Sequence, residues 1–240
     1  MTATHSASQT ARERARAELT REIKQEARRQ LAAHGAQGLS LRAVARELGM
    51  VSSAIYRYFP SRDDLLTALI IEAYDALGAA AEAASAGPPP ADVRGRWRAA
   101  CHAVRDWALA HPHEYALIYG SPVPGYQAPR DTVAPATRAV RVLGDLLADA
   151  GPEMRNVAGS APALPPELAR QSALVADMIA PGVPPAVIAR ALTAWTQLFG
   201  MISFELFGQF VGSLEPADGF FGYAVEQMAD LVGLPAGDAA

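Results

Sequence analysis

The residues best suited to recognition chemistry lie between Ser40 and Arg62. This segment concentrates hydroxyl side chains, tyrosines and arginines on both sides of one glycine, Gly49. Such side chains hydrogen-bond to phosphate oxygens and to the edges of bases. We expect two short helices here, Leu41 to Leu48 and Ser52 to about Tyr58, with Gly49 at the reversal between them. The second helix would direct four polar side chains toward a major groove of DNA. These are Ser52, Ser53, Tyr56 and Arg57.

Apolar residues must hold these two short helices together. Val44, Ala45 and Leu48 supply them on the first helix, and Ile55 and Phe59 on the second. Ser61 and Arg62 then open the next helix, where backbone N–H groups and a cation can hold a phosphate. On its own the pattern also fits an ordinary helical hairpin whose tyrosines and arginines merely decorate the surface.

The surrounding elements are predicted to be helical as well. A basic amphipathic helix begins near Thr10, where Thr10-x-x-Glu13 is a capping signature. Its apolar stripe consists of Leu19, Ile23, Ala27 and Leu31. A fourth helix starts at Ser61, capped by Ser61-x-x-Asp64, and runs toward Ala84. The run Gly87-Pro-Pro-Pro90 ends it and is the clearest linker in the chain.

Helical spacing continues beyond the linker, and signs of strands are almost absent. The expected helices are Val93 to Ala110, Glu114 to Tyr119, Thr137 to Ala150, Glu167 to Ile179, Pro185 to Val211 and Pro216 to Leu231. We expect loops at 120–135 and 151–166, both rich in Pro and Gly. The sequence therefore predicts an all-α protein, with a head at residues 1–86 and a larger helical domain at 87–240.

Charge is divided unevenly between these parts. The 240 residues carry a net charge of −4. Residues 1–62 hold 11 Lys/Arg against 5 Asp/Glu, a net of +6, whereas residues 63–240 hold 10 against 20, a net of −10. A basic head on an acidic body is the electrostatic pattern expected for contact with phosphates. Basic helices also solvate themselves or bind membrane surfaces, so charge alone leaves those alternatives open.

The segment resembles the TetR family of bacterial regulators across roughly residues 15–70. The resemblance rests on the basic helix, the two short helices and the following Phe59-Pro-Ser-Arg-Asp-Asp-Leu-Leu66. It implies that Ser40 caps the first short helix and contacts phosphate, and that Arg42 reaches a base edge or phosphate. It assigns Ser52, Ser53 and Arg57 to bases, Tyr56 and Tyr58 to the DNA backbone, and Arg62 to a phosphate. Three positions depart from the commonest family pattern, since Tyr58 is more often His, Arg62 more often Lys and Val51 more often polar.

The C-terminal half resembles the effector domain of an actinobacterial TetR subgroup named for a Trp-His-Gly motif. Trp195 and Gly200 fit that motif, but Phe199 stands where His is expected. The resemblance implies a homodimer that binds a near-palindromic operator in double-stranded DNA and a small-molecule effector. Repression relieved by ligand is the family default, and activation stays open.

Aromatic and soft side chains of this half are candidates for an effector pocket. They indicate an apolar or aromatic effector, although each of them could equally be ordinary core. The pocket candidates are Trp97, Cys101, Tyr115, Tyr119, Met178, Trp195 and Phe199. The last two helices are expected to pack against their copies in a second subunit. The interface candidates are Ile202, Phe210, Phe221 and Met228.

Other classes of function find little support in the residues. Gly120-Ser-Pro-Val-Pro-Gly125 is not a nucleophile elbow, and we expect neither an enzyme nor a cofactor. Cys101, His102, His111 and His113 lack the spacing of a zinc site, so no metal is expected. One cysteine suits a reducing cytoplasm, and no run of eighteen apolar residues indicates a membrane span. The rival interpretations are a helical ligand-binding module that has lost operator binding, and a membrane-surface protein that uses the basic first helix.

Overall fold

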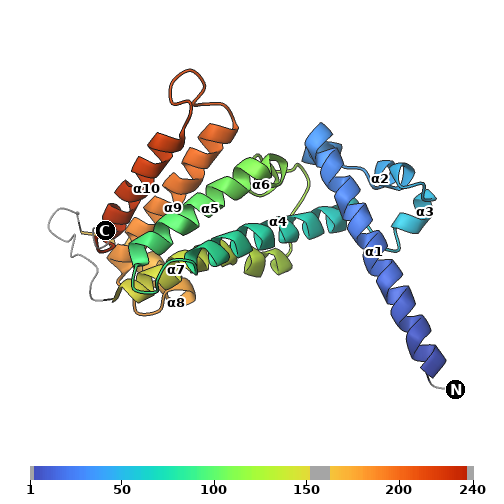
Figure 1. The fold of residues 1–240 in the computed structure, drawn as a ribbon, viewed down its shortest axis with the longest axis horizontal. Helices are drawn as coiled ribbons and strands as arrows, with labels where there is room; N and C mark the ends of the chain where they lie inside the picture. The colour runs from blue at the N-terminus through green and yellow to red at the C-terminus, as the bar shows by residue number, and fades with distance from the viewer. Residues whose placement is uncertain (1–2, 152–162, 237–240) are drawn as a thin grey trace. The chain divides into compact units, whose positions relative to one another are not determined.

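The computed structural model describes residues 3–151 and 163–236, and these residues form helices without a β-strand (Figure 1). The prediction of an all-α protein is therefore confirmed. The helices are α1 (Ala3–His34), α2 (Leu41–Glu47), α3 (Ser52–Ile55), α4 (Arg62–Ser85), α5 (Val93–Ala110), α6 (Pro112–Tyr119), α7 (Val133–Ala150), α8 (Pro166–Ile179), α9 (Pro185–Leu206) and α10 (Asp218–Val232). Two short 3₁₀ turns, η1 (Ala36–Gly38) and η2 (Arg130–Thr132), lie between them.

The chain divides into two compact units. The first contains residues 1–73 and 113–132, and the second contains residues 74–112 and 133–240. Helix α4 contributes its N-terminal half to the first unit and its C-terminal half to the second. Packing therefore divides the chain within α4 and adds α6 to the first unit. The functional boundary expected between residues 86 and 87 lies elsewhere and stays a prediction.

The core of the first unit forms where α1 meets the two short helices. The α1 stripe Ile23, Ala27 and Leu31 is buried, as are Val44 and Ile55 of α2 and α3. Gly49 has φ 64°, the left-handed conformation expected at the reversal. Helix α1 begins at Ala3 and contains Thr10 in its interior, so the predicted start near Thr10 is wrong. Helix-compatible residues upstream allow the helix to extend beyond the capping signature.

The start of α4 follows the predicted capping pattern. The Ser61 hydroxyl accepts a hydrogen bond from the N–H of Asp64 at 3.1 Å and donates one to the Asp64 carboxylate at 2.7 Å. This satisfies one of the N–H groups that a helix start leaves without a partner. Beyond the cap, Leu65, Leu66 and Leu69 are buried, so the amphipathic pattern sets which face of α4 enters the core.

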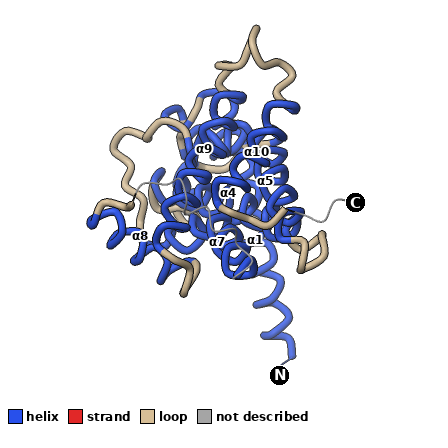
Figure 2. Tube along the Cα trace, turned by 90° about the vertical axis from the view of Figure 1, so that its left-hand side faces the viewer, coloured by secondary structure: helices blue, strands red, loops and turns tan. Residues whose placement is uncertain are grey.

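The second unit is a helical bundle in which α5, α9 and α10 lie side by side (Figure 2). Helix α9 also packs against α8, and α7 packs against α5 and α8. The buried Trp97 indole on α5 donates a hydrogen bond to the carbonyl of Val225 on α10 at 3.0 Å. Helix α9 is long and apolar enough to cross a membrane by length and composition. Its buried side chains contact neighbouring helices, which accounts for an apolar composition on that face.

Most predicted helix positions agree with the structure, and the ends differ by a few residues. Helix α5 has the expected bounds, whereas α9 ends at Leu206 instead of Val211. Gly208 and Gly212 follow with φ 77° and 75°, which breaks helical geometry there. The expected loop 120–135 contains η2 and the first residues of α7. Most of the other expected loop, 152–162 of 151–166, lies outside the described residues.

Candidate nucleic-acid interface

Helix α2 is fixed at its first turn by Ser40 and a buried glutamine of α1. The Ser40 hydroxyl accepts a hydrogen bond from the N–H of Ala43 at 3.4 Å, so its expected capping role is confirmed. The Ser40 N–H donates to the side-chain carbonyl of Gln30 at 3.3 Å. The buried Leu41 follows the cap. Together these contacts set the position of α2, on which Arg42 is exposed to solvent.

Helix α3 buries one face and exposes the other. Ile55 is fully buried and Phe59 nearly so, which anchors the helix against the rest of the unit. The α-helix spans only four residues, and hydrogen bonds from the N–H groups of Tyr58 and Phe59 to the Ile55 carbonyl continue it as a turn. The predicted groove-reading side chains are all solvent-exposed. These are Ser52, Ser53, Tyr56 and Arg57.

A short helix with one anchored face and four exposed polar groups has the geometry needed to enter a major groove. Arg42 and Arg57 form no ion pair within the described residues, which leaves their guanidinium groups available for a phosphate or a base edge. Val51, just before α3, is 72% exposed and could contact a thymine methyl group. The DNA-contacting roles of these residues remain predictions.

Arg62 has a structural role in addition to its expected phosphate contact. Its Nε donates to the carbonyl of Leu39 at 3.2 Å, and its Nη2 donates to the carbonyl of Ala36 at 2.7 Å. Its remaining terminal nitrogen lies 3.4 Å from the Asp63 carboxylate. All three nitrogens therefore have partners within the protein. Arg62 fixes the start of α4 to the segment before α2, and its contact with a phosphate stays a prediction.

Arg16 of α1 is a site residue that sequence reasoning missed. Its Nη2 donates to the carbonyl of Arg57 at 3.2 Å, and its guanidinium lies 5.3 Å from the centre of the Tyr58 ring. A cation over an aromatic face is attractive. Arg16 therefore positions the end of the α3 segment, including Tyr58, which is expected to contact the DNA backbone. The sequence places Arg16 on the same helix face as the apolar residues Ile23 and Ala27, and this position could have indicated that it contacts the rest of the unit.

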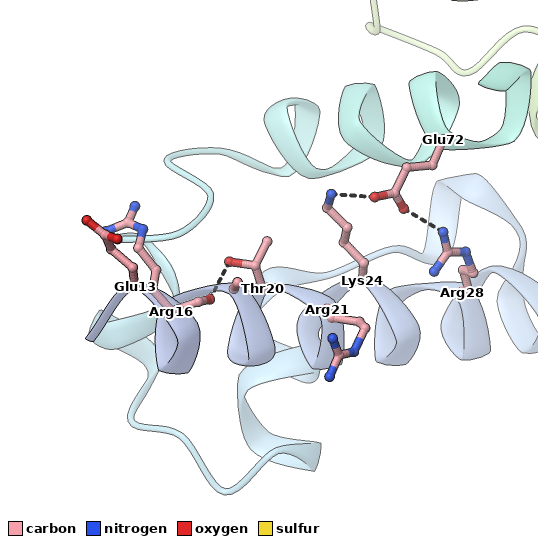
Figure 3. A pocket seen from close by; sticks show the side chains of 8 residues that line it. Glu13, Arg16, Thr20, Arg21, Lys24, Arg28 and Glu72 are labelled. Atoms are coloured by element: carbon pink, nitrogen blue, oxygen red, sulfur yellow. Dashed lines mark hydrogen bonds and ion pairs between the residues drawn. The ribbon is translucent and has the colours of Figure 1, made fainter. Parts of the chain in front are cut away.

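Acidic partners neutralise several cations of the head (Figure 3). The Glu72 carboxylate of α4 lies 2.5 Å from both the Lys24 ammonium and the Arg28 guanidinium of α1. Arg28 also donates to Glu114 of α6 at 2.7 Å. These side chains line part of a groove of about 490 Å³ that continues toward Arg16. The net charge of +6 therefore overstates the cations that remain for DNA.

The second unit contains an apolar cavity at the centre of its bundle. Its walls come from α4, α5, α7 and α9, and they include Trp97, Cys101 and Trp195 from the predicted pocket. The cavity volume is about 20 Å³, so a ligand larger than a water molecule requires the walls to move apart. Burial raises the pKa of the Cys101 thiol well above its usual range, which keeps the thiol neutral.

The structure does not bring the other four predicted pocket residues to this cavity. Met178 on α8 is 67% exposed and does not line this cavity, so its place in an effector pocket stays a prediction. Phe199 packs on the Trp195 ring, with ring centres 4.4 Å apart, and stands outside the lining. Tyr115 and Tyr119 belong to α6 in the first unit, where their rings lie 5.2 Å apart. Helical periodicity shows that a residue lies on the apolar face of its helix. It does not show whether that face lines a cavity or packs in the core.

Three of the four predicted interface residues are buried within their own chain. Ile202, Phe221 and Met228 are between 0% and 2% exposed, so their side chains pack within their own chain in this conformation, and their place in an interface stays a prediction. Phe210 is partly exposed in the loop after α9. Its ring lies 5.8 Å from that of Phe204 and 5.7 Å from that of Phe220. Its place in an interface stays a prediction.

Of the four side chains considered for a metal, Cys101 is buried, two histidines are engaged with aromatic rings, and His113 is exposed. The His102 ring packs edge-on against Phe221, with centres 5.2 Å apart. The His111 ring stacks on Trp107 and its Nδ1 lies 2.9 Å from the Trp107 carbonyl. No group of three or more potential ligands occurs among the described residues.

Comparison with known proteins finds two matching family models in this chain. A sequence model described as bacterial regulatory proteins of the tetR family matches residues 23–69. A second, described as a tetracyclin repressor-like C-terminal domain, matches residues 97–228. The chain belongs to the TetR family of transcriptional regulators. It has the DNA-binding domain of that family, and members of the family are regulators and not enzymes.

Individual relatives agree with this assignment. The HTH-type transcriptional regulator Rv1816 of Mycobacterium tuberculosis (strain ATCC 25618 / H37Rv) is 40% identical over 201 residues, covering 82% of this chain and 84% of the relative. The crystal structure of SCO4313, described as a regulatory protein, shares 34% identity with a TM-score of 0.74 and covers 91% of this chain and 98% of its own. A protein of unknown function from Rhodococcus sp. RHA1 has 26% identity and a TM-score of 0.64, covering 91% and 96%. The Trp-His-Gly subgroup stays a prediction, since none of these matches names it.

Proposed function

We propose that this TetR regulator is a cytoplasmic homodimeric repressor that binds a near-palindromic operator and releases it when a small apolar or aromatic ligand binds. The observation that carries the proposal is the exposed polar face of α3, anchored from behind by Ile55 and Phe59. Two such helices related by two-fold symmetry would enter successive major grooves about one DNA turn apart.

The proposed dimer uses the outer faces of α9 and α10. Phe204 is 55% exposed on α9 and Tyr223 is 64% exposed on α10. Gly200 lies one turn before Phe204 and Gly219 lies one turn before Tyr223, and a side-chain carbon at either glycine would meet only open space. Aromatic side chains beside glycines allow the backbones of two copies to approach closely while burying apolar area. This surface replaces the buried residues first assigned to the interface.

The effector is proposed to enter the apolar cavity of the second unit. Beyond the residues already described, the cavity is lined by Ala81, Ala100, Val104, Ala139, Val142, Leu143, Leu146 and Leu198. No charged side chain is among the lining residues, so a ligand there would gain affinity from burying apolar surface. The small volume requires that such a ligand displace the surrounding helices, which would couple binding to a change of shape.

Arg138 is placed to pass that change from α7 to α4. Its guanidinium donates to the Glu82 carboxylate at 2.9 and 2.6 Å and to the Asp75 carboxylate at 2.7 Å. These hydrogen bonds lower the pKa of Glu82 and keep the pair ionised. The α4 backbone also approaches closely at Gly78, where an added side-chain carbon would lie 2.5 Å from the Arg138 Cβ. Displacement of α7 by a ligand would therefore move α4, the helix that begins at Arg62 in the head.

The direct test is fluorescence anisotropy with DNA from the protein's own promoter region over a series of salt concentrations. We expect the logarithm of the binding constant to fall linearly with the logarithm of the salt concentration, because phosphate contacts release counterions. Arg57→Gln should weaken binding about tenfold or more, since one groove contact contributes about 1–3 kcal/mol. Arg170→Gln, the same charge change on exposed α8, serves as the control. Absence of salt-dependent binding to any upstream fragment would contradict the proposal.

Two alternative functions make different predictions in the same experiments. A helical module that has lost operator binding would bind apolar ligands without binding upstream DNA. An activator would bind the operator but increase expression of a reporter gene placed behind it. Exposed Arg42 and Arg57 favour DNA binding, and reporter assays with and without the protein determine the sign of regulation.

A further inference from the structure

The N-terminal part of α1 extends past α2 and α3 (Figure 1). The match to the family's DNA-binding model begins at residue 23, so residues 3–22 of this helix lie outside it. Twenty helical residues span about 30 Å. This part of α1 is long enough to reach DNA beyond the bases that α3 would read.

One face of this segment is continuous with the proposed DNA surface. Arg16 contacts the Arg57 carbonyl and the Tyr58 ring, which places its helix face beside the end of the α3 segment. The same face carries Ile23 and Ala27 farther along the helix, where it is buried. The face that enters the core at residue 23 therefore becomes a charged face at residue 16.

Arg12 lies one turn before Arg16 on this face. The spacing of four residues places the two arginines about 40° apart around the helix and about 6 Å apart along it. Arg12 is exposed and forms no ion pair within the described residues. Arg14 is also exposed, but it projects about 200° away from Arg12 around the helix. The two arginines thus present the same charge on nearly opposite faces.

We propose that Arg12 binds a phosphate of the DNA that flanks the site contacted by α3, so that α1 lengthens the protein's footprint on DNA. The inference rests on the proposed function, since it assumes that α3 faces DNA. Double-stranded DNA is the occupant because the exposed guanidinium complements its phosphates and because the surface continues from Tyr58 through Arg16. Phosphate contacts of this kind add affinity without choosing a sequence.

The matched pair Arg12→Gln and Arg14→Gln tests this assignment. Binding of the full-length protein to a long random-sequence duplex is measured by anisotropy over a range of salt concentrations. Arg12→Gln should lower the slope of log K against log salt by about 0.9 per subunit, the value for one phosphate contact. Its affinity for the duplex at moderate salt should fall about fivefold, which is the order of magnitude expected when a single contact is lost. Arg14→Gln should change the slope by less than about a third as much, through long-range charge alone.

The outcomes separate this inference from the proposed function. A selective loss in Arg12→Gln supports a phosphate contact by α1. Equal slopes for the two variants, when the unmodified protein binds DNA, would overturn the role of Arg12 and leave the role of α3 intact. No salt-dependent binding by the unmodified protein would overturn both. Circular dichroism melts should coincide for all three proteins because both arginines are exposed, and a lowered melt for Arg12→Gln alone would assign Arg12 to structure instead.

Discussion

The two units of this regulator place their informative residues in opposite environments. In the first unit, the side chains expected to recognise DNA are exposed, and the core beneath them only holds them in place. In the second unit, Trp97, Cys101 and Trp195 line a cavity, and ion pairs join its helices. Exposed recognition residues can change with little effect on folding, whereas interior residues combine binding with stability. Substitutions should therefore separate function from folding in the first unit more cleanly than in the second.

The largest effect is expected from a charge placed in the core of the second unit. Phe221 is 2% exposed and its ring packs against the Arg105 guanidinium and His102. Phe221→Asp should cost more than about 4 kcal/mol of unfolding free energy, because it removes an aromatic core residue and buries a carboxylate. Tyr223→Asp, two residues away and 64% exposed, should keep the fold and yield monomers.

Urea unfolding and sedimentation velocity measure these two changes. A folded Phe221→Asp dimer would show that α10 packs with another face inward. A Tyr223→Asp variant that remains dimeric would remove the proposed interface.

A smaller loss of stability is expected when the buried ion pair between α5 and α9 is broken. Arg105 donates to Glu205 at 2.6 and 2.7 Å and to Asp218 at 3.0 Å. Arg105→Ala should cost about 3 kcal/mol, since it leaves the Glu205 carboxylate largely buried without its cation. Arg98→Ala removes an exposed arginine that pairs with Glu226, and should cost less than about 1 kcal/mol. Similar losses for the two variants in urea unfolding would show that burial does not control these pairs.

The head allows function and stability to be separated at two arginines. Arg57→Gln should weaken DNA binding by about 1–3 kcal/mol and leave unfolding unchanged, because its side chain is exposed. Arg62→Gln should lower the stability of the head by about 1–2 kcal/mol, because it breaks hydrogen bonds to the backbone carbonyls of Leu39 and Ala36. Hydrogen exchange of the head and anisotropy with DNA measure both effects. Unchanged exchange in Arg62→Gln would show that these hydrogen bonds do not stabilise the head.

The smallest expected effect is a pH dependence that comes from Cys101. Burial raises the pKa of this thiol, so the folded protein keeps it protonated when the unfolded chain ionises. Below the ordinary thiol pKa, the neutral Cys101 thiol contributes fully to the free energy of unfolding. This contribution is lost progressively as the pH rises above that pKa. The loss should reach about 1.4 kcal/mol one pH unit above that value. Cys101→Ala should lack this component when the two proteins are compared between pH 8 and pH 10, and parallel curves would show that the thiol is hydrated.

The sequence predicted the helical elements well because apolar periodicity and capping pairs are local signals. The Ser61–Asp64 cap and the bounds of α5 illustrate this. It predicted the start of α1 incorrectly, because a capping signature inside a longer helix-compatible run is not obligatory. It did not predict the hydrogen bonds from Arg62 to the carbonyls of Ala36 and Leu39, because these depend on tertiary packing.

The functional surfaces of the second unit were harder to predict for a related reason. Periodicity marks Ile202 and Phe221 as apolar-facing, yet it cannot distinguish packing within one chain from packing against a second copy. The aromatic residues Phe204 and Tyr223 became apparent only from their exposure in the folded unit. In the head the residues predicted to recognise DNA are polar within an apolar framework, so their types alone set them apart.

The central claim is that α3 reads DNA from a symmetric pair of heads, and selection from a random DNA library tests it most directly. The full-length protein is expected to enrich a near-palindromic sequence with half-sites about one helical turn apart. Arg57→Gln should lose or alter the enriched bases at one position of each half-site, while Arg170→Gln should enrich the same sequence as the unmodified protein. Enrichment of no sequence, or of a sequence that Arg57→Gln recognises unchanged, would contradict the account.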